Sequence, residues 1–267
     1  KVSHKISNVI FESITGIEGI FDTKIAYIST EKNKQRNIYK LHVADVDGFN
    51  SVTIYKSSKQ LMSPTWSPKN NKIAYVSFEN HRPEIFIQTL ATGERVKLIN
   101  GNVSSSAPAW SPNEKFMAYT SSVNGNLEIF VHNFSTKDKR RITNSLGIDT
   151  EAEWGLQSKK IFFTSDRNGK PHIYSKLIKN GKAKRITFEG TYNADANLSA
   201  DGKYLSLVHN NGSGHKIAIY SINDKFLKVI SRGRLDEAPS FAPNGKMILF
   251  ASKKLNKGIL VATSNDG

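Results

Sequence analysis

The sequence contains no cysteine and little tryptophan, methionine or proline: three, three and eight residues among 267. The absence of cysteine excludes disulfide bonds and thiolate metal sites, but it leaves an oxidising compartment open. No stretch approaches the roughly 18 consecutive apolar residues that a membrane-spanning helix requires. The first five residues lack the apolar segment of an export signal, so we expect any such signal to have been removed from this chain.

Acidic residues are also scarce, because 23 Asp and Glu stand against 38 Lys and Arg and leave a formal charge of +15. Such a balance is typical of nucleic-acid-binding proteins. However, the basic residues alternate with Asn, Asp and Gly in predicted tight turns and lack the interleaved aromatic side chains of a single-strand binder. We therefore favour a solvated basic surface that binds no nucleic acid. Its characteristic members are Lys139, Arg140, Lys182, Lys184 and Lys246.

The chain contains a clear internal repeat. Five marker residues, each ending a short predicted strand, follow one another at spacings of 44, 44, 44 and 43: Trp66, Trp110, Trp154, Leu198 and Phe241. A period near 44 built from short strands is typical of a β-propeller, in which each repeat forms one four-stranded blade. We predict an all-β, six-bladed propeller of four-stranded antiparallel blades. The marker residues should pack between neighbouring blades.

The second repeat illustrates the predicted blade, with strands at residues 65–67, 72–78, 84–90 and 95–99. Because consecutive strands alternate in direction, the first–second and third–fourth links should lie at one end of each blade. The second–third loops and the connections between blades should lie at the other end. These latter loops are longer and more varied, and function usually resides in adaptable loops.

Two boundary segments flank the predicted propeller. Four apolar residues at helical spacing precede Gly16, so we predict a helix over residues 3–16. We interpret residues 1–20 as the remnant of a preceding domain or linker, with a plug against the propeller as the alternative, and residues 21–267 as the propeller. The first blade lacks its first strand and the last blade its fourth, so we expect roughly 20 to 30 further residues to close the ring.

Carboxylates gather in the connections between blades, three to five residues before the marker residues. The segments are Asp149-Thr150-Glu151, Asn193-Ala194-Asp195 and Asp236-Glu237. At the start of the first strand of a blade, they would surround one mouth of the central channel. We predict a mildly acidic rim that receives a partner, with calcium as a cation that the channel acids would hold weakly. Pairing of these acids with lysines at the blade edges is the alternative.

No group of catalytic residues emerges from the sequence. Gly212-Ser213-Gly214 lacks the strand–turn–helix context of a hydrolase nucleophile. The seven histidines are scattered, with no pair at metal-ligand spacing. We predict no catalytic residue, no histidine metal site and no enzymatic activity.

Several segments carry a signal more specific than the repeat. They are Leu61 to Pro68, Ile87 to Leu90, Phe163 to Arg167, Arg185 to Gly190, and Ile14 to Ile17. With these segments in this order, the chain resembles the TolB family of periplasmic propeller proteins of the Tol-Pal system. The resemblance implies a non-enzymatic, monomeric, periplasmic scaffold that binds the peptidoglycan-associated lipoprotein Pal at the propeller face and channel mouth. It also implies a role in outer-membrane integrity and cell division, other Tol proteins as partners, and use of the same surface by colicins.

The resemblance also adds candidate residues, because the positions of Ser104, Ala107 and Thr150 match the Pal-binding loops of the family. The complete predicted partner-binding set is Ser104, Ser106, Ala107, Asp149, Thr150, Glu151, Asn193, Asp195, Asp236 and Glu237. One alternative is the propeller domain of a serine peptidase-like enzyme, which would need a Gly-x-Ser-x-Gly hydrolase domain that this chain does not contain. A polyanion binder with steeply salt-dependent affinity is the other.

Overall fold

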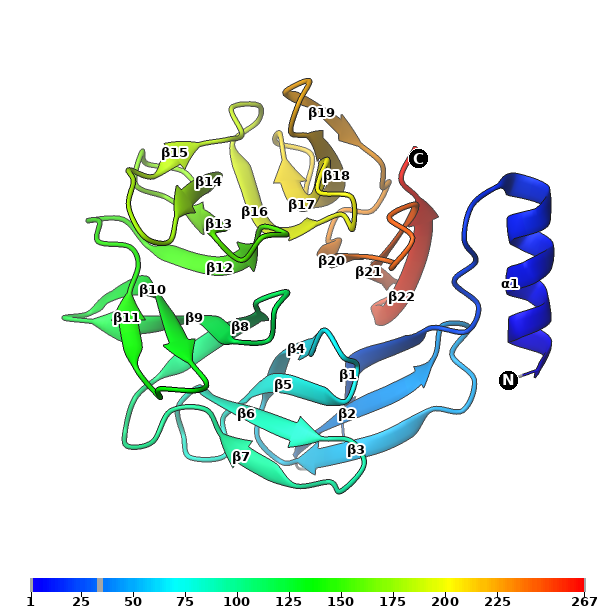
Figure 1. Cartoon of the computed structure of the whole chain (residues 1–267), viewed down its shortest axis with the longest axis horizontal. Helices are drawn as coiled ribbons and strands as arrows, with labels where there is room; N and C mark the ends of the chain where they lie inside the picture. The colour runs from blue at the N-terminus through cyan, green and yellow to red at the C-terminus, as the bar shows by residue number, and fades with distance from the viewer. Residues whose placement is uncertain (1, 33–35, 267) are drawn as a thin grey trace. The chain divides into compact units, whose positions relative to one another are not determined.

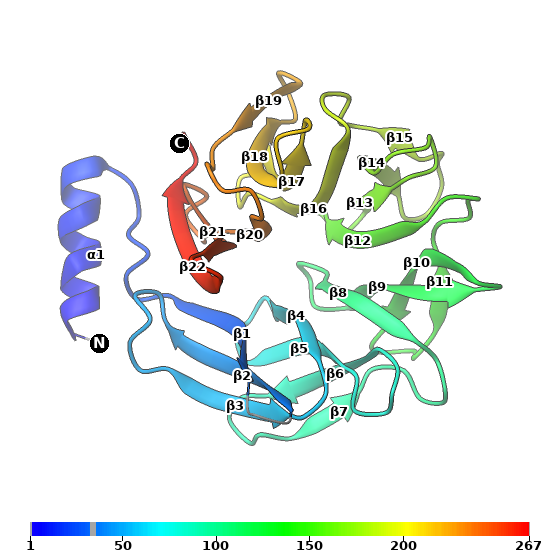
Figure 2. The same cartoon turned by 180° about the vertical axis from the view of Figure 1, so that it is seen from behind.

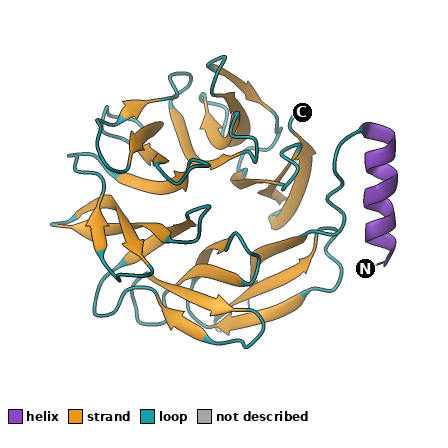
Figure 3. Ribbon diagram, viewed as in Figure 1, coloured by secondary structure: helices purple, strands orange, loops and turns teal. Residues whose placement is uncertain are grey.

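The computed structural model describes residues 2–32 and 36–266. This part of the chain holds one helix, α1 (Val2–Thr15), and is otherwise built from β-strands and the loops between them (Figure 3). The chain divides into two compact units, Lys1–Trp110 and Ser111–Gly267. We call them the N-terminal and C-terminal units.

The N-terminal unit contains a three-stranded sheet of order β1-β2-β3 and a four-stranded sheet of order β4-β5-β6-β7 (Figure 1). All strand pairs in these sheets are antiparallel. The unit ends with β8, the first strand of the third blade. The strand bounds are β1 Lys24–Lys32, β2 Asn37–Asp45, β3 Val52–Ser57, β4 Leu61–Trp66, β5 Lys72–Ser77, β6 Glu84–Thr89, β7 Arg95–Lys97 and β8 Ser105–Trp110.

The C-terminal unit begins with the other three strands of the third blade and continues with two four-stranded sheets and a three-stranded one (Figure 2). Their strand orders follow the chain. The bounds are β9 Phe116–Val123, β10 Asn126–Asn133, β11 Lys139–Arg141, β12 Asp149–Trp154, β13 Lys160–Ser165, β14 His172–Leu177, β15 Lys184–Arg185, β16 Tyr192–Leu198, β17 Tyr204–Asn210, β18 Lys216–Ser221, β19 Phe226–Val229, β20 Glu237–Phe241, β21 Met247–Lys254 and β22 Lys257–Ser264.

The six antiparallel sheets are the blades of a six-bladed β-propeller, which confirms the predicted fold class. The first and last blades have three strands each in the described part of the chain, as the strand count of the sequence predicts. In the second blade, β4 begins four residues earlier than predicted. Its early part holds a β-bulge between Met62 and Thr65, which a strict two-residue alternation does not reveal.

The core lies between successive sheets. In the C-terminal unit, Phe162 and Ile173 of one blade pack with Leu205, Leu207 and Tyr220 of the next. All five marker residues end the first strand of their blades. Trp154 is 3% exposed and stacks on Phe116 at 6.1 Å between ring centroids, and Trp66 packs against the apolar cluster of the N-terminal unit. These two markers thus pack as the repeat predicts.

Backbone hydrogen bonds confirm the two ends of each blade. At one end, the start of a first strand bonds to the second–third loop of the preceding blade, as in Ser105 N to Pro83 O (2.8 Å) and Asn193 N to Pro171 O (2.9 Å). At the other end, the turns meet, as in Leu90 N to Asn71 O at 3.0 Å. We call these the loop end and the turn end.

The helix α1 has no buried residue and contacts the turn between β2 and β3, where His4 Nε2 lies 3.1 Å from Asp47 Oδ2. It ends where predicted, because Gly16 takes a left-handed conformation (φ +66°) that terminates helices readily. Its apolar residues Ile6, Val9, Ile10 and Ile14 are more than half exposed. The helix is tied to the following segment by Asn8, whose Oδ1 accepts a hydrogen bond from Phe21 N. Whether residues 1–20 belong to a preceding domain stays a prediction.

Candidate functional site

The first strand of each blade bends at one repeated position, three residues before the marker. The residues at this position all have positive φ values between 46° and 54°: Ser63, Ala107, Glu151, Asp195 and Ala238. Four of these strands show a register shift at the same place. A bulge of this kind increases local twist and redirects side chains, and a positive φ is costly for residues other than glycine.

At this bulge, the first strands of neighbouring blades in the C-terminal unit are linked by their side chains. The Glu151 carboxylate accepts a hydrogen bond from the Thr164 hydroxyl at 2.7 Å and from the Asp195 amide at 3.0 Å. The Asp195 carboxylate in turn accepts one from the Ala238 amide. The structure therefore brings the predicted residues Glu151 and Asp195 together.

A second link runs parallel to the first, one residue before the markers. The Glu153 carboxylate accepts hydrogen bonds from the Leu198 amide at 3.0 Å and from Asn197 Nδ2 at 3.1 Å. Asn197 Oδ1 accepts one from the Phe241 amide at 2.8 Å. Glu153 and Asn197, at equivalent repeat positions, thus each accept a hydrogen bond from the backbone amide of the marker residue in the next blade.

Two of these carboxylates, those of Glu153 and Asp195, have raised pKa values. Burial raises the pKa of Glu153 to about 7. Burial also raises the pKa of Asp195, and the negative charges of Glu151 and Glu153 raise it further. Glu237 is exposed and adds to the same field. Acidic side chains therefore lie on the first strands β12, β16 and β20, and their role as a rim that receives a partner stays a prediction.

Three other predicted residues are buried five residues before their markers: Asp149, Asn193 and Asp236. The Asp149 carboxylate accepts a hydrogen bond from Arg167 Nη2 at 2.7 Å. The Asp236 carboxylate accepts one from the Ser252 hydroxyl at 2.6 Å. These side chains hold the loop end together, and their contribution to partner binding stays a prediction.

Asn193 bridges two buried histidines. Its Oδ1 lies 2.9 Å from His209 Nδ1, and its Nδ2 lies 3.0 Å from His172 Nδ1. The amide therefore assigns the proton of His209 to Nδ1 and leaves His172 Nδ1 as an acceptor. Burial lowers the pKa of both rings, that of His172 to about 4.

The remaining predicted residues are half-buried. Ser104, Ser106 and Ala107 lie around the start of β8 in the N-terminal unit. Thr150, in the C-terminal unit, shares a hydrogen bond of 3.1 Å with the Thr120 hydroxyl of the preceding blade. Ala107 and Thr150 therefore place small side chains at the loop end of their blades.

Metal-ligating side chains form no cluster in the described residues. Among residues 2–32 and 36–266, no group of three or more His, Asp or Glu side chains is arranged to hold a metal ion. Weak calcium binding stays a prediction. The Ser213 hydroxyl, which the sequence excludes as a nucleophile, donates a hydrogen bond to Asn211 Oδ1 at 2.8 Å. Within the same residues, α1 is too short and too polar to cross a membrane.

Comparisons with known proteins identify the family to which this propeller belongs. A profile of the TolB beta propeller domain matches residues 11–267. The chain belongs to the TolB β-propeller family. It is 56% identical to the Tol-Pal system protein TolB of Xanthomonas oryzae pv. oryzae strain PXO99A over 267 residues, 99% of this chain and 61% of that protein. The TolB protein of Xanthomonas campestris pv. campestris strain B100 is 55% identical over the same share. The chain thus spans about three fifths of the length of these TolB relatives.

Solved structures agree with the TolB assignment. The crystal structure of TolB from Acinetobacter baumannii superposes with a TM-score of 0.94 at 43% identity, covering 100% of this chain and 67% of that one. A puromycin-hydrolyzing peptidase from Mycobacterium tuberculosis superposes with a TM-score of 0.64 at 14% identity. The second likeness reflects the propeller fold alone.

Sequence reasoning missed two features of the site. The bulge went unseen because Ala, Asp, Glu and Ser occupy the left-handed position, where glycine would have announced it. The Asn193–His172–His209 cluster went unseen because its members lie in three different strands. The repeat phase would have revealed the first feature, since the five residues share one offset from the markers.

Proposed function

We propose that this TolB-family propeller is the non-enzymatic, periplasmic, partner-binding part of a Tol-Pal system protein, and that its partner is the lipoprotein Pal. In this role it supports outer-membrane integrity and cell division. Other Tol proteins and colicins are further partners of the same surface. Weakly bound calcium belongs to the same proposal, with the acidic first strands as its location.

The observation that carries the proposal is the bulge of the first strands. It places small or acidic side chains at the loop end on backbone that the next blade stabilises, as Glu151 does through the Asp195 amide. A rigid surface loses little conformational entropy on binding. Small residues such as Ala107 let the backbone of a partner approach closely, and the neighbouring carboxylates select for basic groups or amide donors.

The proposal is tested by isothermal titration with the soluble domain of Pal. Ala107→Arg and Thr150→Arg each add a long cationic side chain at the contact. Losing a central contact typically costs about 2 kcal/mol or more, so we expect roughly thirtyfold weaker binding. Each variant is melted in parallel to verify that the blade remains folded.

Two controls separate contact from fold and charge. Thr150→Ser retains the hydroxyl that meets Thr120 and should bind Pal like the wild type. Lys182→Ala removes an exposed charge from the turn end and should leave the affinity unchanged. Wild-type affinity in both arginine variants, with unchanged melting, would refute a Pal site at these residues.

A further inference from the structure

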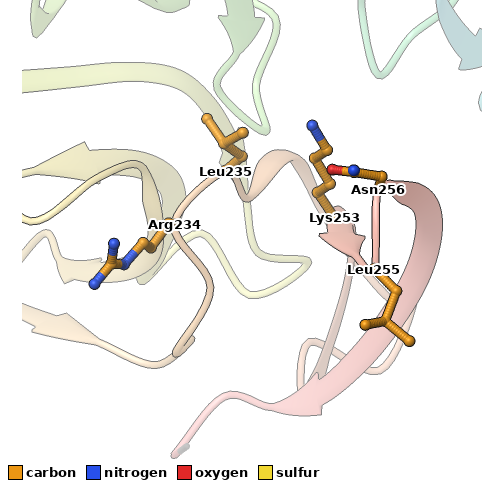
Figure 4. Close-up of a pocket in the computed structure, with 5 residues that line it drawn as sticks. All are labelled: Arg234, Leu235, Lys253, Leu255 and Asn256. Atoms are coloured by element: carbon orange, nitrogen blue, oxygen red, sulfur yellow. The ribbon is translucent and has the colours of Figure 1, made fainter.

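A cleft opens at the loop end between the fifth and sixth blades of the C-terminal unit. One wall is the connection from β19 to β20, and the other is the hairpin between β21 and β22. The cleft has a volume of about 390 Å³ and is lined by Arg234, Leu235, Lys253, Leu255 and Asn256 (Figure 4). It contains none of the residues proposed above to contact Pal.

The cleft and its margins carry an excess of positive charge. Five exposed cations lie in the two chain segments that form the walls: Arg232, Arg234, Lys253, Lys254 and Lys257. Of these, Arg234 and Lys253 line the cleft itself. Within residues 2–32 and 36–266, the structure shows no ion pair for any of these five. Within that part of the chain, the sixth blade therefore carries unpaired cations in its loops beside the acidic residues of its first strand.

At the loop ends of the third and fourth blades, an arginine pairs with a buried carboxylate. Arg141 pairs with Glu128 at 2.8 Å, and Arg167 pairs with Asp149 at 2.7 Å. Asp236 occupies the same repeat position as Asp149, but its carboxylate accepts hydrogen bonds from two serine hydroxyls and the Gly233 amide. The buried acid of this blade is thus satisfied without a cation, and the cations remain available to a ligand.

Asp236 also makes the cleft rigid, because it joins the two walls. It binds the Gly233 amide of one wall at 3.0 Å and the Ser252 hydroxyl beside the other at 2.6 Å. The Arg234 carbonyl accepts a hydrogen bond from the His215 amide at 3.0 Å. The loop has no space for a side chain at Gly233, since a Cβ there would lie 1.9 Å from Asp236 Oδ1. A preorganised surface of this kind favours binding.

Two exposed leucines complete the surface. Leu235 is 56% exposed and Leu255 is 90% exposed. Single exposed apolar residues are ordinary, but here two of them flank a cationic cleft. The combination matches a ligand that carries carboxylates and apolar side chains close together.

We propose that this cleft docks an acidic, amphipathic peptide segment of a partner protein, with Arg234 and Lys253 binding its carboxylates and the two leucines contacting its apolar side chains. A membrane surface fits less well, because its headgroups would need a broad basic face, whereas the cations here border a cleft of side-chain dimensions. The proposal concerns a second surface, so it stands independently of Pal binding.

The test uses a fluorescein-labelled peptide of three Glu-Leu-Glu-Glu repeats and measures fluorescence anisotropy against the protein. Arg234→Glu and Lys253→Glu should each weaken binding by at least about tenfold, because each reverses a charge at the contact. Leu255→Ser should weaken it about threefold or more. The matched control Lys182→Glu makes the same change in net charge at the turn end and should weaken binding less than about twofold.

Three outcomes would overturn the proposal. The first is an absence of peptide binding at low ionic strength, and the second is an equal loss in the cleft and control variants. The third is tighter binding to phosphatidylglycerol vesicles than to the peptide, with the same variants affected, which would assign the cleft to a lipid surface. Parallel titration with Pal distinguishes the two surfaces, since Arg234→Glu should bind Pal like the wild type.

Discussion

Glu151 and Asp195 occupy the same position in consecutive repeats, and the carboxylate of the first accepts a hydrogen bond from the amide of the second at 3.0 Å. Both have positive φ values, 53° and 54°. The interaction shows how the propeller retains a costly backbone conformation. The side chain of the bulged residue in one blade binds the backbone amide of the bulged residue in the next blade. Backbone strain of this kind persists only where surrounding contacts determine it.

At Ala238, which has a φ of +53° and is exposed, the bulge should make glycine more favourable than valine, the reverse of the order in a regular strand. Ala238→Gly should be neutral or should stabilise by up to about 1 kcal/mol, because glycine adopts positive φ without a Cβ clash. Ala238→Val should destabilise by roughly 1 to 3 kcal/mol. Urea denaturation measures both. Ala262, exposed in the regular strand β22, is the control, and there valine should be tolerated better than glycine. The same order at both positions would contradict the strain argument.

The raised pKa of Glu153 predicts that ionising this residue destabilises the fold. Its pKa of about 7 in the folded state lies above the usual value of 4.5, so the native state retains a proton that the unfolded state has lost between these values. The free energy of unfolding contributed by Glu153 therefore falls as pH rises from about 4.5 to 7. Glu153→Gln should remove this decline and make the protein roughly 1 to 3 kcal/mol more stable relative to wild type at pH 8 than at pH 4.5. Parallel pH dependence of the two proteins in thermal melts would disprove the assignment.

The buried histidines predict the opposite dependence. His172, 3% exposed, has its pKa lowered to about 4 by burial and by the charge of Arg185. The unfolded state therefore binds more protons between about pH 6.5 and 4, and stability falls as pH decreases through this range. His172→Gln should lessen that fall, by at most about 3 kcal/mol. The measurement is the melting temperature of variant and wild type from pH 7 to 4.5, and an undiminished acid loss in the variant would show that other groups cause it.

The stability of the cluster of Asn193, His172 and His209 should depend on the Asn193 side chain. Asn193→Ala leaves two buried imidazoles without their common partner, which typically costs about 1 to 3 kcal/mol. Thr191→Ala is a suitable control because Thr191 is exposed nearby and its hydroxyl bonds the carbonyl of Asn210, at 3.2 Å, and neither histidine. Denaturant titration at pH 7 should show a large loss for the first variant and a small one for the second. Equal losses would mean that the connection, and not the histidine bridge, sets the stability.

The loop held by Asp236 predicts a contrast between two glycines. Gly233→Ala would place Cβ 1.9 Å from Asp236 Oδ1, whereas a Cβ at Gly258 meets no atom within 4 Å. We expect Gly233→Ala to destabilise by about 2 kcal/mol or more, since the carboxylate would lose its buried hydrogen bonds. Gly258→Ala should be neutral or slightly stabilising. Thermal melts of both variants provide the measurement, and an unchanged melting temperature for Gly233→Ala would contradict the described loop.

The sequence by itself determined the architecture. The period of 44 residues, the marker residues and the short alternating strands specify repeated blades, because each blade must bury apolar residues against the next at the same position. The C-terminal end of the helix followed from Gly16, and three of the four strands predicted in the second repeat begin where predicted. Because the local sequence pattern and the global fold agree here, the pattern of neighbouring residues was sufficient to predict the propeller.

Only the tertiary structure decided what the polar residues do. Asp149, Asn193 and Asp236 share one repeat position and similar chemistry, yet they bind an arginine, two histidines and two serines respectively. Most of those partners lie in other strands or loops, 16 to 21 residues along the chain, where no local pattern encodes the contact. The same holds for the cationic cleft, whose two walls are separate loops. The energy of a charge depends on burial and on the groups that three-dimensional packing brings near it, and so the site, unlike the fold, could not be derived from the sequence alone.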